Sequence, residues 1–360
     1  MNGLKIAYLL MDVCQVGGIE RVVCGMASAL AEKHGYDVSI YSMYTKEESK
    51  PYFDFSPKVN IVHLGADWRD YVGMKSIGFV YRIVRMIDAD ILITSHNYIS
   101  IFAVLSKGFS KKKIIITEHQ AYDYYSKKAI LLNSIFYRFA KKVVLLSDYN
   151  KAYYESKGFR KCEVIPNSIE LGNESFSVLE NKTIITAGRA EEVKGFDMLI
   201  DAFAIVNKRF PDWKLKILGD GTCLPQLKKQ AENLGIGKAV EFTGFVKNPE
   251  EHFTQASVFV MSSRSEGFPM VLLEAMRSGL PCCAFDIPAA KNLLNNESGL
   301  LIPSNDVEKL AEGLISLVQS KELRCFYAEK SKKRVQDFSV ESVSGQWHNL
   351  FNELNGKKCK

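Results

Sequence analysis

The stretch TIITAGRAEEVKGFDMLIDAF, residues 183–203, has the pattern of a buried strand, a turn and an amphipathic helix. A short apolar run (183–188) ends at a glycine, and the apolar residues of 196–203 recur with helical spacing. The same alternation continues along nearly the whole chain of 360 residues. Strands that alternate with helices form parallel sheets covered by helices on both faces, so the sequence predicts an α/β protein.

The apolar runs expected to be strands fall into two series. The first series comprises 4–11, 37–43, 59–65, 90–95, 113–118, 142–147 and 162–166, and the second comprises 183–188, 213–219, 240–245, 258–263, 281–286 and 299–303. The polar segment 171–181 separates them and is expected to be a linker. We therefore predict two Rossmann-like doubly wound domains, 1–170 and 171–337, that face a cleft where their strands end. A helix expected over 338–354 could pack on either domain.

The composition, 47% hydrophobic and 24% charged, is typical of a soluble globular protein and excludes a disordered chain. No stretch approaches the roughly 20 apolar residues that a membrane-spanning helix needs. The start of the chain is interpreted as a strand and not as a signal peptide. None of the eight cysteines forms a Cys-x-x-Cys pair, so we expect a reduced, cytoplasmic protein. No metal-ligand motif or Walker sequence occurs, and no catalytic metal is expected.

The net charge of +6 is concentrated in one segment. Residues 107–142 hold nine Lys and Arg against two Asp and Glu, interleaved with Tyr and Phe. Within this segment, 127–142 has an amphipathic pattern. A helix lying on an anionic membrane surface and a core-packed helix with a solvated basic face both fit that pattern. Nucleic acid is not expected as a partner, because the rest of the chain has no basic excess.

Glycines and histidines follow several strands of the first series. Gly17 and Gly18 precede a helix, where the backbone could approach a phosphate, although an ordinary strand-to-helix turn would look the same. They lack the G-x-G-x-x-G spacing of dinucleotide-binding proteins. His96 and His119 each end a strand and could reach a ligand, but a lone histidine is more often structural.

Two cations follow the first strand of the second series. Arg189 stands directly after the strand, and Lys194 stands shortly before the next helix. Such a pair can neutralise a diphosphate. Alternatively, the two cations pair with Glu191 and Glu192 in a solvated loop.

The segment SSRSEGFPMVLLEAMRSGLPC (262–282) has the strongest combination of features. Pro269 suits the first turn of a helix and would leave the amides of 268–271 free to face an anion. Glu274 lies on a helix that is apolar nearly all round, so it needs a partner, either a ligand hydroxyl or a neighbouring basic side chain. Glu266, in the preceding loop, could bind the same ligand.

Several ordered motifs resemble those of the retaining family 4 glycosyltransferases of the GT-B fold, and in particular the bacterial surface-polysaccharide enzymes of the amylovoran-biosynthesis type. The motifs are GGIERVV (17–23), VIPNSI (164–169), GR…KGFD (188–197), ILGDG (217–221) and EGFPMVLLEAM (266–276). Together they span nearly the full length, and the last has the family's E-x₇-E spacing. After Asp286 the chain departs from many relatives, which continue with glycines and a glutamate.

The resemblance implies a role for each matching residue. Arg189 and Lys194 would hold the donor diphosphate, Glu274 the ribose hydroxyls and Glu266 the transferred sugar. The other implied donor contacts are Gly17, Gly18, Gly188, Phe268, Pro269 and Met270. His119 would lie beside the reacting sugar and His96 on the acceptor side. The helix of 338–360 would cross back onto the first domain, which would hold the acceptor.

The resemblance also implies a reaction. The expected donor is a nucleotide-sugar, UDP-linked, and the acceptor is a glycan or lipid-linked sugar at the inner face of the membrane. No residue is an obvious covalent nucleophile, so we expect attack from the leaving-group face, with the anomeric configuration retained and no metal required. A nucleotide-sugar epimerase, a non-catalytic sugar-binding protein and a nicotinamide oxidoreductase remain as alternatives.

Overall fold

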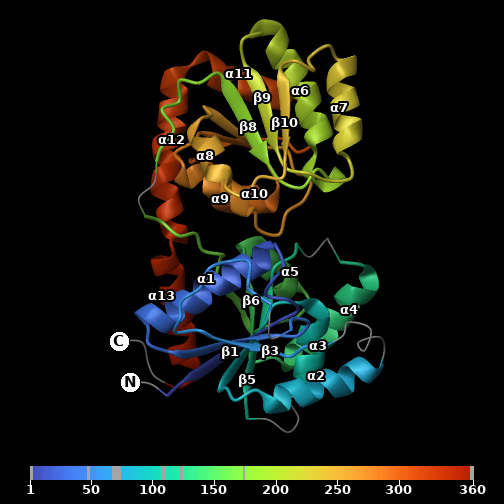
Figure 1. Ribbon diagram of the computed structural model, residues 1–360, viewed down its shortest axis with the longest axis vertical. Coiled ribbons are helices and arrows are strands. Elements are labelled where there is room, and N and C mark those ends of the chain that lie inside the picture. Colours follow the sequence, from blue (N-terminus) through green and yellow to red (C-terminus); the bar gives the residue numbers. More distant parts are fainter. Residues whose placement is uncertain are drawn as a thin grey trace. The chain divides into compact units, whose positions relative to one another are not determined.

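The computed structural model describes residues 3–46, 49–66, 74–106, 111–121, 125–172 and 175–356. Parts of the basic segment (107–110 and 122–124), of the linker (173–174) and of the C-terminal region (357–360) lie outside the described residues. The contacts divide the chain into unit 1, Met1–Glu170 with Ser339–Lys360, and unit 2, Leu171–Phe338. Each unit contains a parallel sheet flanked by helices (Figure 1), which confirms the predicted fold class of two Rossmann-like doubly wound domains.

The described part of unit 1 contains a seven-stranded parallel sheet with the order β3-β2-β1-β4-β5-β6-β7. The strands are β1 (Lys5–Leu10), β2 (Asp37–Ser42), β3 (Asn60–His63), β4 (Ile91–Thr94), β5 (Lys113–Glu118), β6 (Lys142–Leu145) and β7 (Cys162–Val164). Each lies within an apolar run that was predicted to be a strand. The central strands β1, β4 and β5 are buried on both faces, which explains why each contains a run of consecutive apolar residues.

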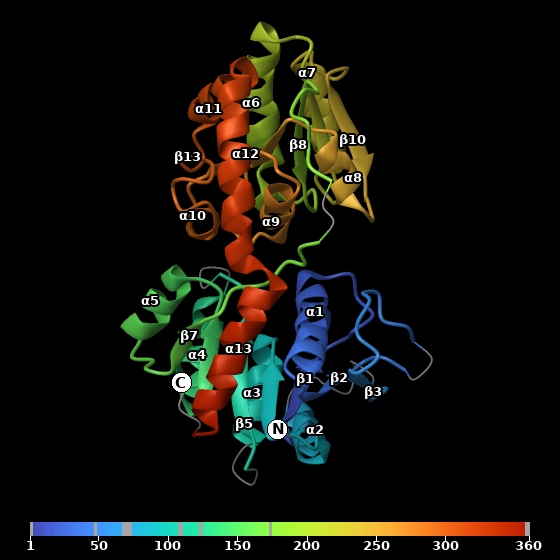
Figure 2. The same ribbon diagram turned by 90° about the vertical axis from the view of Figure 1, so that its left-hand side faces the viewer.

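Different helices cover the two faces of the unit 1 sheet. The helices of the unit are α1 (Gly18–Lys33), α2 (Met74–Met86), α3 (Asn97–Leu105), α4 (Lys127–Phe136), the 3-10 helix η4 (Tyr137–Phe139), α5 (Asp148–Ser156) and α13 (Val340–Leu354). Helices α1 and α13 pack side by side on one face (Figure 2), where Trp347 and Phe351 enter the core. Residues of α2, α3, η4 and α5 form the core on the other face.

The described part of unit 2 contains a six-stranded parallel sheet with the order β10-β9-β8-β11-β12-β13. Its strands are β8 (Thr183–Ala187), β9 (Lys214–Leu218), β10 (Val240–Gly244), β11 (Val258–Met261), β12 (Cys282–Phe285) and β13 (Leu300–Ile302). The helices are η5 (Glu192–Lys194), α6 (Phe196–Arg209), α7 (Leu224–Asn233), α8 (Pro249–Thr254), α9 (Met270–Arg277), α10 (Pro288–Leu294), α11 (Val307–Gln319), α12 (Lys321–Val335) and η6 (Gln336–Phe338). Helix α6 contacts α7 and α11, and helix α9 contacts α8, α10 and α12.

The strand order reverses once in each sheet, between β1 and β4 and between β8 and β11. At such a switch point the connections after the two central strands leave in opposite directions and open a crevice at the carboxyl edge. Gly17, His96, Arg189 and Glu266 follow β1, β4, β8 and β11, respectively. The topology therefore places all four at the edge where open α/β sheets bind ligands.

The helix expected over 127–142 is shorter than predicted. Helix α4 ends at Phe136, a 3-10 turn follows, and Lys142 already belongs to β6. The helix ends because Tyr137 is buried and donates a hydrogen bond to Glu118 Oε2 at 3.0 Å, while the chain must turn to pair β6 with β5. None of the helices in the described ranges is long and apolar enough to cross a membrane.

Candidate active site

A partly buried ion pair joins two of the predicted site residues in unit 2. Lys194 Nζ donates to Glu266 Oε1 at 2.6 Å, and the Ser263 hydroxyl donates to the same oxygen at 2.7 Å. The Lys194 and Glu266 side chains are only 18% and 13% exposed. The methylenes of Lys194 pass over Gly188, where a Cβ atom would lie 3.4 Å from Lys194 Cε. The structure thus brings Gly188, Lys194 and Glu266 together, and the alternative pairing of Lys194 within its own loop is wrong.

Arg189 is exposed at the end of β8, next to an acidic side chain. Glu191 accepts hydrogen bonds from the Thr222 hydroxyl at 2.7 Å and from the Thr222 amide at 3.1 Å. These bonds hold the pKa of Glu191 below its usual range, and the charge of Arg189 lowers it further. Arg189 therefore remains able to face either Glu191 or an incoming anion.

The start of helix α9 provides backbone amides and a buried carboxylate. Pro269 is the N-cap residue, one position earlier than its predicted place in the first turn, and Met270 is the first helical residue. No side chain caps this helix start, so its first amides are left for another acceptor. Phe268 is buried and packs edge-on against Phe338, with the ring centroids 6.1 Å apart, so only its backbone can face a ligand. Glu274 is 4% exposed, one turn further along α9.

The glycine pair of unit 1 lies at the start of helix α1, with an acidic side chain folded over it. Gly17 is the N-cap residue and Gly18 is the first helical residue. A Cβ atom on Gly17 would lie 2.1 Å from Glu20 Oε2, so a larger residue there would displace the Glu20 carboxylate. Burial raises the pKa of Glu20, and Asp12 raises it further. Glu20 was not among the residues predicted from the sequence, although a carboxylate three residues after an N-cap is a known signal of a helix start.

His119 is held by hydroxyl groups at the ends of β4 and β5. Its Nε2 lies 3.1 Å from Thr117 Oγ1, which lies 3.2 Å from the carbonyl oxygen of Thr94 and 2.9 Å from Ser95 Oγ. Thr117 donates its one proton either to the Thr94 carbonyl oxygen or to Ser95 Oγ, and in both cases it accepts from Nε2–H of His119. Burial, together with the nearby His96, lowers the pKa of His119 to about 3. The imidazole is therefore neutral at pH 7, with the lone pair of Nδ1 free to accept.

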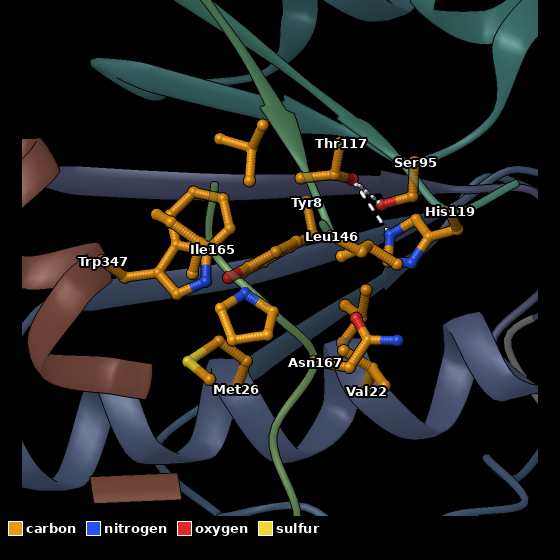
Figure 3. A pocket seen from close by; sticks show the side chains of 13 residues that line it. Tyr8, Val22, Met26, Ser95, Thr117, His119, Leu146, Ile165, Asn167 and Trp347 are labelled. Carbon is orange, nitrogen blue, oxygen red and sulfur yellow. Dashed lines mark hydrogen bonds between the residues drawn. The ribbon is translucent and has the colours of Figure 1, made fainter. Parts of the chain in front are cut away.

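His119 lines a pocket of unit 1 (Figure 3) that measures about 360 Å³ with its opening to solvent. The polar lining is Ser95, Thr117, His119 and Asn167; the remaining lining residues are Tyr8, Val22, Val23, Met26, Val144, Leu146, Ile165, Pro166 and Trp347. His96 lies outside this lining, at the N-cap of α3. Its Nδ1 is buried without a hydrogen bond, and burial lowers its pKa to about 4.

The sequence matches known enzymes over both units. Residues 16–173 match the family model described as Glycosyltransferase Family 4, and residues 169–334 match the model described as Glycosyl transferases group 1. An uncharacterized glycosyltransferase of Haemophilus influenzae is 30% identical over 359 residues, which cover 96% of this chain and 99% of that protein. The chain belongs to glycosyltransferase family 4.

Other relatives of this family 4 glycosyltransferase carry more specific names. The amylovoran biosynthesis glycosyltransferase AmsD of Erwinia amylovora is 27% identical and covers 97% of this chain and 99% of its own length. A Campylobacter jejuni enzyme is 25% identical over 98% of this chain and 99% of its own length. It is named as an alpha-1,4-N-acetyl-D-galactosaminyltransferase that acts on a GalNAc-GalNAc-diNAcBac-PP-undecaprenol.

Solved structures share the fold of this glycosyltransferase. Sucrose-phosphate synthase from Thermosynechococcus elongatus superposes with a TM-score of 0.84 at 18% identity and covers 99% of this chain and all of that chain. HepE from Anabaena was solved in complex with UDP and glucose. It superposes with a TM-score of 0.78 at 17% identity, over 98% of this chain and all of that chain. These similarities identify the GT-B fold.

Three further residues of this glycosyltransferase, Ser263, Arg264 and Glu118, were not predicted from the sequence. Ser263 and Arg264 belong to the segment that was singled out, but nothing in their spacing distinguished them from other loop residues. Glu118, directly before His119, is buried, and burial raises its pKa. Its carboxylate accepts from the hydroxyls of Tyr125 at 2.7 Å and Tyr137 at 3.0 Å. Tyr154 also donates to this carboxylate, at 3.5 Å. A buried carboxylate held by three tyrosines fixes the end of β5, and thus the backbone that carries His119.

Proposed function

We propose that this glycosyltransferase moves a sugar from a nucleoside-diphosphate donor, a UDP-sugar, to a glycan or lipid-linked acceptor, with retention of anomeric configuration and without a metal. The observation that supports this most is the contact of Lys194 with Glu266 at the switch point of unit 2. A cation suits a diphosphate, and a carboxylate suits sugar hydroxyls. The two groups meet where the departing phosphate and the transferred sugar must be neighbours.

The departing diphosphate develops negative charge on the oxygen that leaves the anomeric carbon. Lys194, Arg189 and the backbone amides at the start of α9, which no side chain caps, supply positive charge and dipoles at fixed positions. Lys194 exchanges its carboxylate partner for phosphate when the donor binds. Glu266 then accepts from a sugar hydroxyl and stays oriented by the Ser263 hydroxyl, while Glu274 accepts from the ribose.

The acceptor hydroxyl attacks from the face that the diphosphate leaves. The new glycosidic bond forms as the bond to the diphosphate breaks, and the departing phosphate oxygen takes the proton of the acceptor hydroxyl. His119 stays neutral and directs a sugar hydroxyl through its free Nδ1 lone pair. We assign donor binding to unit 2 and acceptor binding to unit 1.

The names of similar proteins support the choice of substrates. HepE was solved with UDP, the Campylobacter enzyme is named for an acceptor on diphospho-undecaprenol, and the Erwinia enzyme is named for polysaccharide biosynthesis. We therefore place this chain in bacterial polysaccharide synthesis at the inner face of the membrane.

The proposal is tested by a ligand screen followed by product analysis. Nucleoside diphosphates are compared by thermal shift, because a ligand at 100 times its Kd stabilises a protein by about 2.7 kcal/mol. The sugar of the best nucleotide is then offered with undecaprenol-linked acceptors, and the anomeric configuration of the product is read by proton NMR with and without EDTA. We expect a retained product in both conditions. An inverted product, or a loss in EDTA that Mg²⁺ or Mn²⁺ restores, would contradict the mechanism, and an epimerised sugar without acceptor would identify an epimerase.

An exposed apolar patch supports the membrane as a further partner. The patch consists of Leu131, Leu132, Ile135 and Phe139 on α4 and η4, which are 61%, 41%, 47% and 58% exposed. The alternative of a core-packed helix would have buried these side chains. The exposed residues Lys127, Lys128 and Lys141 lie in the same segment. Apolar side chains next to lysines match the boundary of an anionic bilayer.

Lys142 does not belong with the exposed lysines Lys127, Lys128 and Lys141. Its ammonium lies 3.2 Å from Glu163 and 3.1 Å from Glu353, and its side chain is 17% exposed. Its charge is therefore used within unit 1, where it ties β6 to β7 and to α13. A test of membrane binding has to leave Lys142 unchanged.

Replacing Lys127, Lys128 and Lys141 with Glu is expected to abolish co-sedimentation with vesicles that contain anionic lipid. Each lysine near such a surface contributes about 1 kcal/mol, and the attraction fades over a Debye length of about 8 Å. The matched control replaces Lys208, Lys229 and Lys238, three exposed lysines of unit 2, with Glu and should bind as the wild type does. If the wild type fails to bind vesicles at low salt, the acceptor reaches the enzyme without help from this patch.

A further inference from the structure

Arg264 connects the two loops that carry Lys194 and Glu266. It lies between β11 and α9. Its guanidinium donates two hydrogen bonds to the Asp197 carboxylate, from Nη1 to Oδ1 at 2.9 Å and from Nη2 to Oδ2 at 2.6 Å. Nη1 also donates to the carbonyl oxygen of Glu192 at 2.5 Å. These bonds raise the pKa of Arg264 and lower the pKa of Asp197. The Arg264 side chain therefore binds the segment that carries Lys194 on both sides of it, at Glu192 before Lys194 and at Asp197 after it.

The backbones of the two loops are also joined directly. The amide of Arg264 donates to the carbonyl oxygen of Val193 at 2.8 Å, and the Ser262 hydroxyl donates to that of Lys194 at 3.0 Å. Gly195 has a φ of +63°, and a Cβ atom there would lie 2.1 Å from the carbonyl oxygen of Ser262. Only glycine satisfies both requirements, so the backbones touch at this point.

We propose that Arg264 is a positioning residue, which with Asp197 sets the place of the Lys194 ammonium relative to the Glu266 carboxylate. This inference rests on the proposed donor site and adds to it a residue that touches neither phosphate nor sugar. Glu266 follows Arg264 by two residues in the same loop, and Lys194 lies between the two points that Arg264 holds. A shift of this arginine therefore changes the distance between the two groups.

The geometry requires a guanidinium and not merely a positive charge. The two parallel hydrogen bonds to the Asp197 carboxylate need the planar fork of arginine, whereas a lysine ammonium is a compact charge on a flexible stem and does not reproduce that paired geometry. The Arg264 and Asp197 side chains are 32% and 46% exposed. An ion pair this exposed contributes little to the free energy of unfolding, so its main effect is expected on the site.

The kinetic test is a double-mutant cycle between Arg264→Lys and Lys194→Met. Arg264→Lys and Asp197→Asn should each lower kcat/KM for the donor about 10- to 100-fold, because small displacements in a site cost this much. In the Lys194→Met background, Arg264→Lys should have almost no further effect, since no ammonium remains to be positioned. Wild-type kinetics of Arg264→Lys, or equal effects in both backgrounds, would overturn the proposal.

The matched control is Arg277→Lys in the same unit. Arg277 Nη2 lies 2.7 Å from Glu250 Oε2, at the far end of α9 from the loop, and the two side chains are 14% and 43% exposed. This variant should keep wild-type kcat/KM. Melting temperatures of Arg264→Lys and Arg277→Lys should agree within about 4 °C. A much lower melting temperature for Arg264→Lys, together with additive kinetics, would assign Arg264 a structural role only.

A labelling experiment separates this inference from the proposed function. The rate at which an amine-reactive reagent modifies Lys194 in the full chain is measured by mass spectrometry without any substrate. Arg264→Lys should raise that rate severalfold and Arg277→Lys should not, because only the first releases Lys194 from Glu266. An unchanged rate overturns the inference. If the rate rises but the wild type binds no nucleoside diphosphate, the loop coupling stands and the proposed function fails.

Discussion

Lys194→Ala is expected to lower kcat by about 10²–10³, the usual cost of removing one preorganised group that stabilises developing charge. The ammonium is already held at 2.6 Å from Glu266 Oε1 and is mostly buried, so little reorganisation is needed when phosphate replaces the carboxylate. Arg189→Ala should act in the same direction. Steady-state kinetics with a nucleotide-sugar donor measure both effects.

A second variant separates the charge of Lys194 from its packing. Lys194→Met keeps an unbranched chain over Gly188 but has no charge, so it should lose as much activity as Lys194→Ala. Lys291→Ala is the control, because Lys291 is a half-exposed lysine of the same unit that pairs with Asp286. Recovery of activity in Lys194→Met would show that packing over Gly188, and not charge, is what the site needs.

Glu266→Gln and Glu274→Gln are expected to affect different kinetic constants. Glu266→Gln should lower kcat by about 10²-fold with little change in donor KM, because its carboxylate orients the reacting sugar beside Lys194. Glu274→Gln should weaken donor binding about 10- to 150-fold, which corresponds to a lost charge-assisted hydrogen bond of roughly 1.5–3 kcal/mol.

The split between the two glutamates is checked by measuring donor affinity and turnover for each variant. Calorimetric titration with the nucleoside diphosphate gives binding without turnover, and initial rates at saturating donor give kcat. Glu250→Gln provides the control for an amide substitution, since Glu250 pairs with Arg277 away from the loop. Wild-type values for either Glu266→Gln or Glu274→Gln would remove that residue from the site.

The strands were predictable because each depends on its own residues. The run KIIITE (113–118) has three consecutive isoleucines, as is typical of a strand buried on both faces, and β5 has the same bounds. The helix expected over 127–142 failed for a tertiary reason. Tyr137 bonds to Glu118, and this contact ends α4 where the local pattern would have continued.

The candidate site was predictable in its members but not in its contacts. Lys194 and Glu266 were found by their positions after strands, yet their pairing across 72 residues follows from the switch between β8 and β11. Glu20 was overlooked because its one sequence signal is its place three residues after the N-cap glycine, and only the structure shows its carboxylate folded back onto Gly17.

The sequence by itself determined the two series of strands, the glycines and charges that follow them, and the family of the chain, because periodicity and motif spacing are properties of neighbouring residues. The tertiary structure decided which loops meet. Arg264 and Asp197 are 67 residues apart and have no local pattern in common, and strand order alone brings them together. It also decided that Leu131 and Ile135 stay exposed, since burial depends on what the rest of unit 1 places against α4.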